Sequence, residues 1–425
     1  MSQLPNIVVF QTDDHAQWAL PSYGGTEFSA PNISALADRG MVFENAFTPT
    51  PVCSPARASL LTGLMSSQHG IRDFLSSKPE FLLNDWLGRF DTLPEQLALA
   101  GYACAHVGKW HQGQSQKAAP GFDFWHAMSD KYPVFHTGEQ EFCVDGQIKN
   151  QDGVLTELVT DHAVEFLEHR DRTKPFFLYV GYYATHSPWS GHPKHLVPSD
   201  EPQLPLETPP PGYRLRHNEL RNLTPENARE ARAQYRAAVS EIDQGVGQVL
   251  SALSEDEDTL VVYTADHGLS MGQNGVFGKG NGTVPQNLFD ENIRIPMILS
   301  RPGHIAQGAR DPRFCDLTDL YTTLRSVAQI ALAEGDGLSR PGTNMFSRTP
   351  AKSFQVCEYG DVAAIIDEHG RQEFRRGGDP GDVDSRLESF YRHIEAQPPW
   401  TWKFPQKPTF NLNEAWRDPQ GIYGS

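Results

Sequence analysis

One cysteine in this chain stands where it could act as a nucleophile beside an anion. Residues 53–63 read Cys-Ser-Pro-Ala-Arg-Ala-Ser-Leu-Leu-Thr-Gly, in which Ser54 is a typical N-cap, Pro55 suits the first helical position and a glycine ends the helix. The pattern predicts a short helix with Cys53 at its N-terminus, where N–H groups and the helix dipole favour an anion. Arg57, one turn in, could direct its guanidinium at the same group. A buried packing cysteine is the alternative on these residues alone.

Further polar residues directly follow predicted strands. Apolar, β-branched runs predict strands at residues 6–10, 102–107, 176–183 and 259–264. The carboxyl ends of parallel strands meet at one sheet edge, where α/β proteins bind ligands. The sequence therefore predicts a single site assembled from several strands. The polar residues that follow these four strands are Asp13, Asp14, Lys109, His111, His186, Asp266 and His267.

The adjacent carboxylates Asp13 and Asp14 suit a hard cation, because calcium and magnesium prefer oxygen ligands. A solvated acidic turn is the alternative, since aspartate is common in turns. The chain carries a formal net charge of −17, so any site for an anionic substrate must be locally cationic.

The stretch Cys-x-Pro-x-Arg followed by Ala-Ser-Leu-Leu-Thr-Gly resembles the signature of the type I sulfatases, within the alkaline phosphatase superfamily. In that family the cysteine is oxidised after translation to formylglycine, whose hydrated aldehyde is the nucleophile. The resemblance covers most of residues 6–300. It implies one divalent metal held by the oxidised Cys53 together with Asp13, Asp14, Asp266 and His267.

The metal that the resemblance implies is usually calcium, with magnesium and manganese as alternatives. His267 stands where relatives more commonly have asparagine, although Asp-His also occurs among them. A nitrogen ligand is softer than an amide oxygen, so this departure bears on the identity of the metal.

The resemblance also implies the catalytic roles. Lys109 and His111, in Gly-Lys-Trp-His, match the pair that binds the sulfate and the formylglycine, and His186 matches the histidine near the leaving oxygen. Lys279, between two glycines that would admit the substrate closely, matches the distal sulfate-binding lysine. One hydroxyl of the hydrated aldehyde would attack sulfur. His111 would take a proton from the second hydroxyl as sulfate leaves, and His186 would protonate the departing alcohol.

The expected function is hydrolysis of an aryl or carbohydrate sulfate monoester to an alcohol and inorganic sulfate, after a maturation enzyme has converted Cys53. A phosphate or phosphonate monoester hydrolase of the same superfamily is one alternative. Asp14 and Lys109 favour sulfate over it, because those relatives typically alter one of these two positions. The second alternative is a non-catalytic protein that binds sulfate esters with Cys53 unconverted.

The elements that position these residues alternate between strand and helix, which predicts an α/β fold with a mostly parallel sheet and helices on both faces. We expect a catalytic domain at 1–335 and a smaller C-terminal α+β subdomain at 336–425. The latter would comprise a hairpin of 354–359 with 362–367, a helix near 383–396 and a tail that wraps the main body. The proline-rich stretch 187–223 has no periodicity and could form a substrate-facing lid.

The amino-acid composition limits which binding partners and which cellular compartment we expect for this protein. The net negative charge argues against nucleic-acid and anionic-membrane partners. Five cysteines without a CxxC pair indicate free thiols in a reducing compartment. The sequence shows neither a signal peptide nor an apolar run of membrane-spanning length, so a cytoplasmic enzyme is expected.

Overall fold

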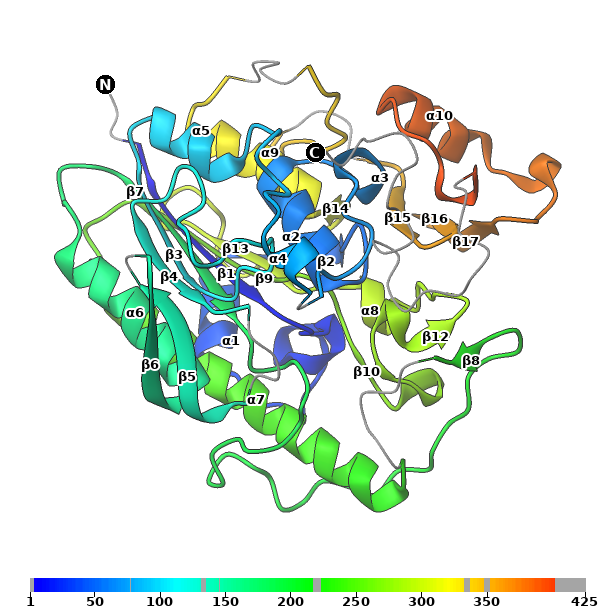
Figure 1. The fold of residues 1–425 in the computed structure, drawn as a ribbon, viewed down its shortest axis with the longest axis horizontal. Helices are drawn as coiled ribbons and strands as arrows, with labels where there is room; N and C mark the ends of the chain where they lie inside the picture. The colour runs from blue at the N-terminus through cyan, green and yellow to red at the C-terminus, as the bar shows by residue number, and fades with distance from the viewer. Residues whose placement is uncertain are drawn as a thin grey trace.

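A large mixed sheet forms the centre of the molecule (Figure 1). The structure is a computed structural model that describes residues 4–76, 78–130, 135–144, 146–216, 223–331, 337–347 and 352–401. Within these residues the sheet has ten strands in the order β14-β2-β13-β9-β1-β7-β3-β4-β5-β6. The strands are β1 (Asn6–Thr12), β2 (Met41–Phe47), β3 (Ala103–Gly108), β4 (Phe124–Met128), β5 (Thr137–Val144), β6 (Gln147–Val154), β7 (Phe176–Tyr182), β9 (Thr259–Ala265), β13 (Met297–Ser300) and β14 (Ala309–Asp316).

The centre of this sheet is parallel, as the sequence predicts. Strand β1 pairs in parallel with both β7 and β9, and β3 pairs in parallel with β7 and β4. Strand β13 runs antiparallel to β9 and β2, and β5 and β6 extend the far edge as an antiparallel hairpin. The sequence analysis did not predict β4, β5, β6 or β14.

Helices cover both faces of the sheet (Figure 1). Val8 and Phe10 of β1 pack in one core cluster, and Ile7 and Val9 pack in the other, because successive strand residues point to opposite faces. One layer contains α1 (Pro31–Asp38), α6 (Leu155–His169) and α7 (Pro225–Ser251), and the other contains α2 (Cys53–Thr62), α5 (Leu93–Leu99) and α9 (Leu317–Val327). This layering confirms the predicted fold class.

Helix α2 begins earlier than the sequence predicts. Its N-cap is Val52, so Cys53 is the first helical residue and Ser54 is not the cap. The Ser54 hydroxyl instead accepts a hydrogen bond from the backbone N–H of Leu75 at 3.0 Å. The predicted C-terminus at Gly63 is correct, with φ of 71°. The earlier start places Cys53 inside the first turn, among the unpaired N–H groups of the helix.

The C-terminal region contains a three-stranded antiparallel sheet, one strand more than the predicted hairpin. Its strands are β15 (Gln355–Tyr359), β16 (Val362–Asp367) and β17 (Gly370–Arg375), followed by α10 (Ser385–His393). This sheet shares a core cluster with Phe47, Val52 and Leu288 of the main body. The expected boundary between a catalytic domain and a C-terminal subdomain at residue 335 stays a prediction. Most of the tail that was expected to wrap the main body lies outside the described residues.

The stretch 187–216 has little regular structure, as expected, while residues 217–222 lie outside the described part. Its one short strand, β8 (Arg214–Leu215), pairs with β12 (Thr283–Val284). A lid function for this stretch stays a prediction. The remaining short elements are α3 (Ser66–His69), α4 (Pro79–Leu82), α8 (Asp290–Ile293), β10 (Ser270–Met271) and β11 (Phe277–Gly278).

All five cysteines are buried and none of them forms a disulfide, which agrees with the expected thiols. Among the described residues, none of the helices has the length and apolarity needed to cross a bilayer.

Candidate active site

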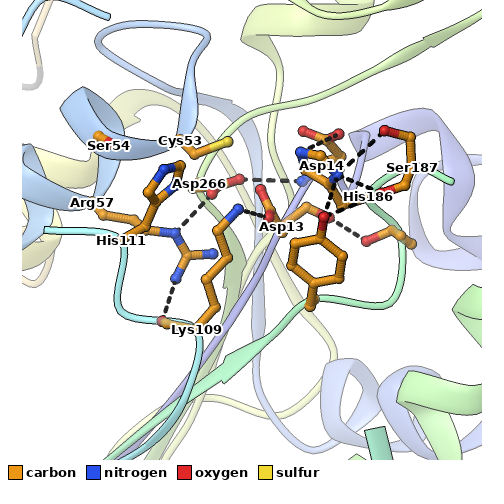
Figure 2. Close-up of polar contacts among 12 residues, drawn as sticks. Asp13, Asp14, Cys53, Ser54, Arg57, Lys109, His111, His186, Ser187 and Asp266 are labelled. Carbon is orange, nitrogen blue, oxygen red and sulfur yellow. Dashed lines mark hydrogen bonds and ion pairs between the residues drawn. The ribbon is translucent and has the colours of Figure 1, made fainter. Parts of the chain in front are cut away.

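Cys53 lies in the first turn of α2, close to several cationic and imidazole groups (Figure 2). Its Sγ is 3.2 Å from Nζ of Lys279 and 3.4 Å from Nε2 of His267, and it hydrogen-bonds with His111. Burial raises the pKa of the thiol, but Lys109, Lys279 and His267 outweigh burial and hold the pKa well below its ordinary value. The site therefore stabilises negative charge at position 53.

Four buried ligand-type side chains meet at this point. Ligand atoms of Asp13, Asp14, Cys53 and His267 all lie within 4.8 Å of one another. Oδ1 of Asp13 and Oδ2 of Asp14 have no hydrogen-bond partner among the described residues. Buried carboxylate oxygens without partners are costly unless a cation lies nearby. The residues present therefore fit a divalent metal.

His267 is oriented toward this cluster by the backbone. Its Nδ1 donates to the carbonyl of Gly268 at 2.8 Å, so Nε2 faces Oδ1 of Asp14 at 3.2 Å. A backbone carbonyl bound to one ring nitrogen fixes the tautomer and leaves the other nitrogen as a metal ligand. Burial lowers the pKa of His267, but Asp266 and Asp14 raise it to about 9.

Asp266 lies beside the cluster, and its oxygens are already hydrogen-bonded. Oδ1 accepts from the backbone N–H of Asp14 at 3.2 Å and of His267 at 2.8 Å, and Oδ2 accepts from Nε of Arg57 at 2.9 Å. Burial and Asp13 raise its pKa to about 7. The structure thus places Asp266 between Arg57 and the other carboxylates, and its role as a metal ligand stays a prediction.

Lys109 and His111 enter the site from the turn after β3. Nζ of Lys109 forms an ion pair with Asp13. Gly108 has φ of 88°, and a Cβ there would lie 2.2 Å from the carbonyl oxygen of Gly181, so only glycine fits at this turn. Nε2 of His111 donates to the carbonyl of Leu75 at 2.9 Å, so Nδ1 is the nitrogen left to accept a proton.

Burial raises the pKa of Asp13 and Asp14, but the neighbouring cations act in the opposite direction. For Asp13, Lys109, His186 and Lys279 outweigh burial and hold the pKa below its usual range. For Asp14, burial prevails over Lys279 and the pKa is raised. The two adjacent carboxyls therefore differ in acidity because their partners differ.

His186 follows β7 and faces the same site (Figure 2). Its Nδ1 is 2.8 Å from the carbonyl oxygen of Ser187 and 3.0 Å from the hydroxyl of Tyr183, while Nε2 is 3.9 Å from Oδ2 of Asp14. Burial and Lys279 lower the pKa of His186, but Asp14 and Asp13 reverse the shift and raise it. The two carboxylates therefore favour the protonated form of His186.

Lys279 reaches the site from the opposite side. Its Nζ is 2.7 Å from Oδ1 of Asp14. The sequence analysis interpreted the flanking glycines as room for substrate. At Gly280 this is wrong, because a Cβ there would lie 2.7 Å from Pro51 and 3.0 Å from the ring of Tyr359. This glycine lets the turn pack against the C-terminal sheet.

Some residues that support the site were not predicted. The hydroxyl of Thr185 donates to the carbonyl of Asp13, and the ring of Tyr183 lies 4.9 Å from Nζ of Lys109. Both residues follow β7 directly, so their strand-end position was a usable signal. Tyr235 of α7 donates to the carbonyl of Asp14 at 3.0 Å. Nothing in the sequence marks Tyr235, because a helix far along the chain brings it there.

Comparison with known proteins gives one consistent family. A family model described as Sulfatase matches residues 5–330. The chain is 26% identical over 427 residues to an N-acetylglucosamine-6-O-sulfatase of Bacteroides thetaiotaomicron, with 84% of this chain and 74% of that protein covered. It is 30% identical over 363 residues to the N-acetylgalactosamine-6-sulfatase of Rattus norvegicus, with 77% of this chain covered. The alignment spans only 62% of that rat protein.

The fold has solved counterparts. A protein crystallised with its substrate D-glucosamine-2-N,6-O-disulfate superposes with a TM-score of 0.75 at 22% identity, covering 94% of this chain and all of that one. At this identity the likeness establishes the fold.

Proposed function

The chain belongs to the sulfatase family of sulfuric ester hydrolases, and we propose from this premise that it hydrolyses the sulfate monoester of a carbohydrate. The observation that carries the proposal is the position of Cys53. It lies within the signature stretch, 3.2 Å from Lys279 and 3.4 Å from His267, beside two buried carboxylates. The sequence alone left aryl and carbohydrate esters open, and the names of the relatives favour the carbohydrate.

The proposed nucleophile is residue 53 after oxidation of its thiol to formylglycine. The cations around position 53 would hold the sulfate group. Lys109 and Lys279 each carry an ammonium group at the site, and Arg57 fixes the carbonyl of Lys109 through a 3.0 Å hydrogen bond. Preorganised positive charge of this kind stabilises the charge on the sulfuryl oxygens in the transition state.

Two histidines would move the protons. His111 lies close to residue 53, and its Nδ1 would accept a proton from it, because Nε2 already donates to Leu75. Asp14 and Asp13 favour the protonated form of His186, whose Nε2 would give its proton to the departing alcohol oxygen.

We propose that Asp13, Asp14, His267 and residue 53 hold one divalent metal, with Asp266 as a further ligand or as the group that orients Asp14. Such a metal would act as a Lewis acid toward oxygens at residue 53 and the sulfate. The carboxylate oxygens favour calcium, with magnesium or manganese as alternatives, and the softer His267 nitrogen bears on the choice among them.

The test uses protein produced together with a formylglycine-generating enzyme. Peptide mass spectrometry should find an aldehyde at residue 53, and sulfate release from N-acetylglucosamine-6-sulfate should be measured against a matched phosphate ester. We expect a preference for sulfate. We also expect Cys53→Ala to lose about 10⁴–10⁶-fold in kcat, whereas Cys104→Ala, a buried cysteine outside the site, should stay active.

Metal dependence is tested on the same protein. Chelation should cut activity, and Asp13→Ala should lose both the bound metal and the rate. Full activity of Cys53→Ala would remove the proposed nucleophile. A clear preference for phosphate would move the assignment to a phosphate monoester hydrolase.

A further inference from the structure

A second cluster of metal-ligand side chains lies on strands and a helix that the active site does not use. His126 is on β4, and His162 and Glu165 are on α6. Nδ1 of His126 is 2.8 Å from Nδ1 of His162. Oε2 of Glu165 lies 3.3 Å from Nδ1 of His162 and 3.7 Å from Nδ1 of His126. Strand β4 is separated from β1 by β7 and β3, so this cluster is distinct from the one around Cys53.

Gln151 of β6 fixes the orientation of His162. Its Oε1 lies 3.1 Å from Nε2 of His162. An amide oxygen can only accept, so Nε2 donates to it and Nδ1 is the nitrogen that faces His126 and Glu165. A metal-binding histidine is typically held in this way by an acceptor at its other nitrogen.

A cation would satisfy the three converging atoms together. Without one, a proton between the two Nδ1 atoms, 2.8 Å apart, would also have to serve Oε2 of Glu165, which lies 3.3 Å from Nδ1 of His162. The two imidazole rings are nearly buried, and the ring centroids of His126 and Phe124 lie 4.0 Å apart with the planes tilted by 31°. In such surroundings an uncompensated polar contact is costly.

We propose that His126, His162 and Glu165 bind a divalent transition-metal ion of the zinc class. Two imidazole nitrogens, one carboxylate oxygen and a water make a typical four-coordinate zinc shell. Zinc–nitrogen bonds of about 2.0–2.1 Å separate two ligand nitrogens by roughly 3.3 Å, so the two rings move apart by about half an ångström on loading. The Glu165 side chain is 48% exposed and gives the ion a route from solvent.

The ion would fasten the sheet edge to the helical layer. It would join β4 to α6 directly and involve β6 through Gln151, at the edge where β4, β5 and α6 lie together (Figure 1). This role is independent of sulfate hydrolysis, so the site and the proposed function can fail separately.

The experiment is equilibrium dialysis of the full chain against Zn²⁺ in saturating Ca²⁺, with zinc counted per chain. The wild-type protein should bind one zinc ion more than His162→Gln. The control variant His169→Gln, which changes an exposed histidine of the same helix, should bind as much zinc as the wild type. Glu165→Gln should weaken this zinc by about tenfold or more, and Gln151→Ala by about 10–100-fold. Binding should weaken as the pH falls, because a protonated imidazole nitrogen cannot bind a metal.

Two further measurements separate this site from the active centre and from misfolding. Asp14→Ala should lose metal at the active centre and keep this zinc. Added Zn²⁺ should raise the Tm of wild type and not of Glu165→Gln, which changes a half-exposed side chain and should fold. Equal zinc content in wild type, His162→Gln and Glu165→Gln would overturn the proposal, and so would a zinc that is lost in Asp14→Ala.

Discussion

At the scale of single residues, the charge around position 53 explains why the site suits an anion in a chain of net charge −17. Lys109 and Lys279 each pair with one of the adjacent carboxyls, Asp13 and Asp14. The negative residues are thereby matched locally, and the ammonium groups remain next to Cys53. Local charge therefore decides what the site binds, and the net charge does not.

His186 should matter in proportion to how much the leaving group needs a proton. General acid catalysis contributes typically about 10²–10⁴-fold. His186→Ala should therefore slow a sugar sulfate by about that factor and barely slow nitrophenyl sulfate, whose phenolate leaves without a proton. His195→Ala, an exposed histidine on the same stretch, serves as the control.

The pH profile gives a second readout. The pKa of His186 is raised above its ordinary value, and the protonated form is the active one, so kcat/KM for the sugar sulfate should fall as pH rises through that pKa, above about 6.5. This alkaline limb should flatten in His186→Ala. An equal loss of rate for both leaving groups would show that His186 binds sulfate only.

At the scale of elements, a residue of one helix caps the N-terminus of another helix that is far away in the sequence. Helix α1 begins after Ala30, which offers no side-chain cap. Asp243 of α7 supplies the cap instead, because its carboxylate accepts from the backbone N–H of Ile33 and from Nδ2 of Asn32, both at 2.8 Å. Helices α1 and α7, which lie on the same face of the sheet, are therefore held together partly by polar contacts.

Removing this cap should destabilise the protein without changing its chemistry. Asp243→Ala leaves the buried N–H of Ile33 without an acceptor, which we expect to cost about 1–3 kcal/mol of unfolding free energy in urea titration. The exposed Asp161→Ala on α6 should change stability by less than about 0.5 kcal/mol. A kcat that fell with stability at saturating substrate would contradict a purely structural role.

At the scale of the whole molecule, the C-terminal sheet is joined to the catalytic body by buried polar contacts. Glu358 of β15 is fully buried. It accepts from the Ser66 hydroxyl at 2.8 Å, the Ser67 backbone N–H at 2.6 Å and the Tyr391 hydroxyl at 2.6 Å. The same sheet presents Tyr359 to the Gly280 turn beside Lys279, so its docking also supports the active site.

We therefore predict that the two parts unfold together. Glu358→Ala should lower the unfolding free energy by at least about 1–3 kcal/mol, because it leaves buried donors unpaired. Glu368→Ala, in the exposed turn between β16 and β17, should have little effect. Tryptophan fluorescence and loss of activity should report a single transition in both variants. Two separate transitions would show that the C-terminal unit folds on its own.

The sequence by itself determined the fold class and most residues of the candidate site. Alternating strands and helices predict a parallel sheet, and the carboxyl ends of parallel strands lie at one edge of the sheet. The sequence therefore predicts that the residues following these strands lie together, namely Asp13, Lys109, His186 and Asp266. The Cys53 stretch supplied the family resemblance that the comparisons confirm.

Only the tertiary structure decided how these residues are paired. Val52 replaces Ser54 as the cap of α2 because Leu75, distant in sequence, takes the serine hydroxyl. Gly280 makes room for the C-terminal sheet, and Tyr235 reaches Asp14 from a helix more than two hundred residues away. The cluster of His126, His162 and Glu165 arises because β4 packs beside α6. Local sequence carries propensity and periodicity, whereas a partner remote in the chain leaves no local signal.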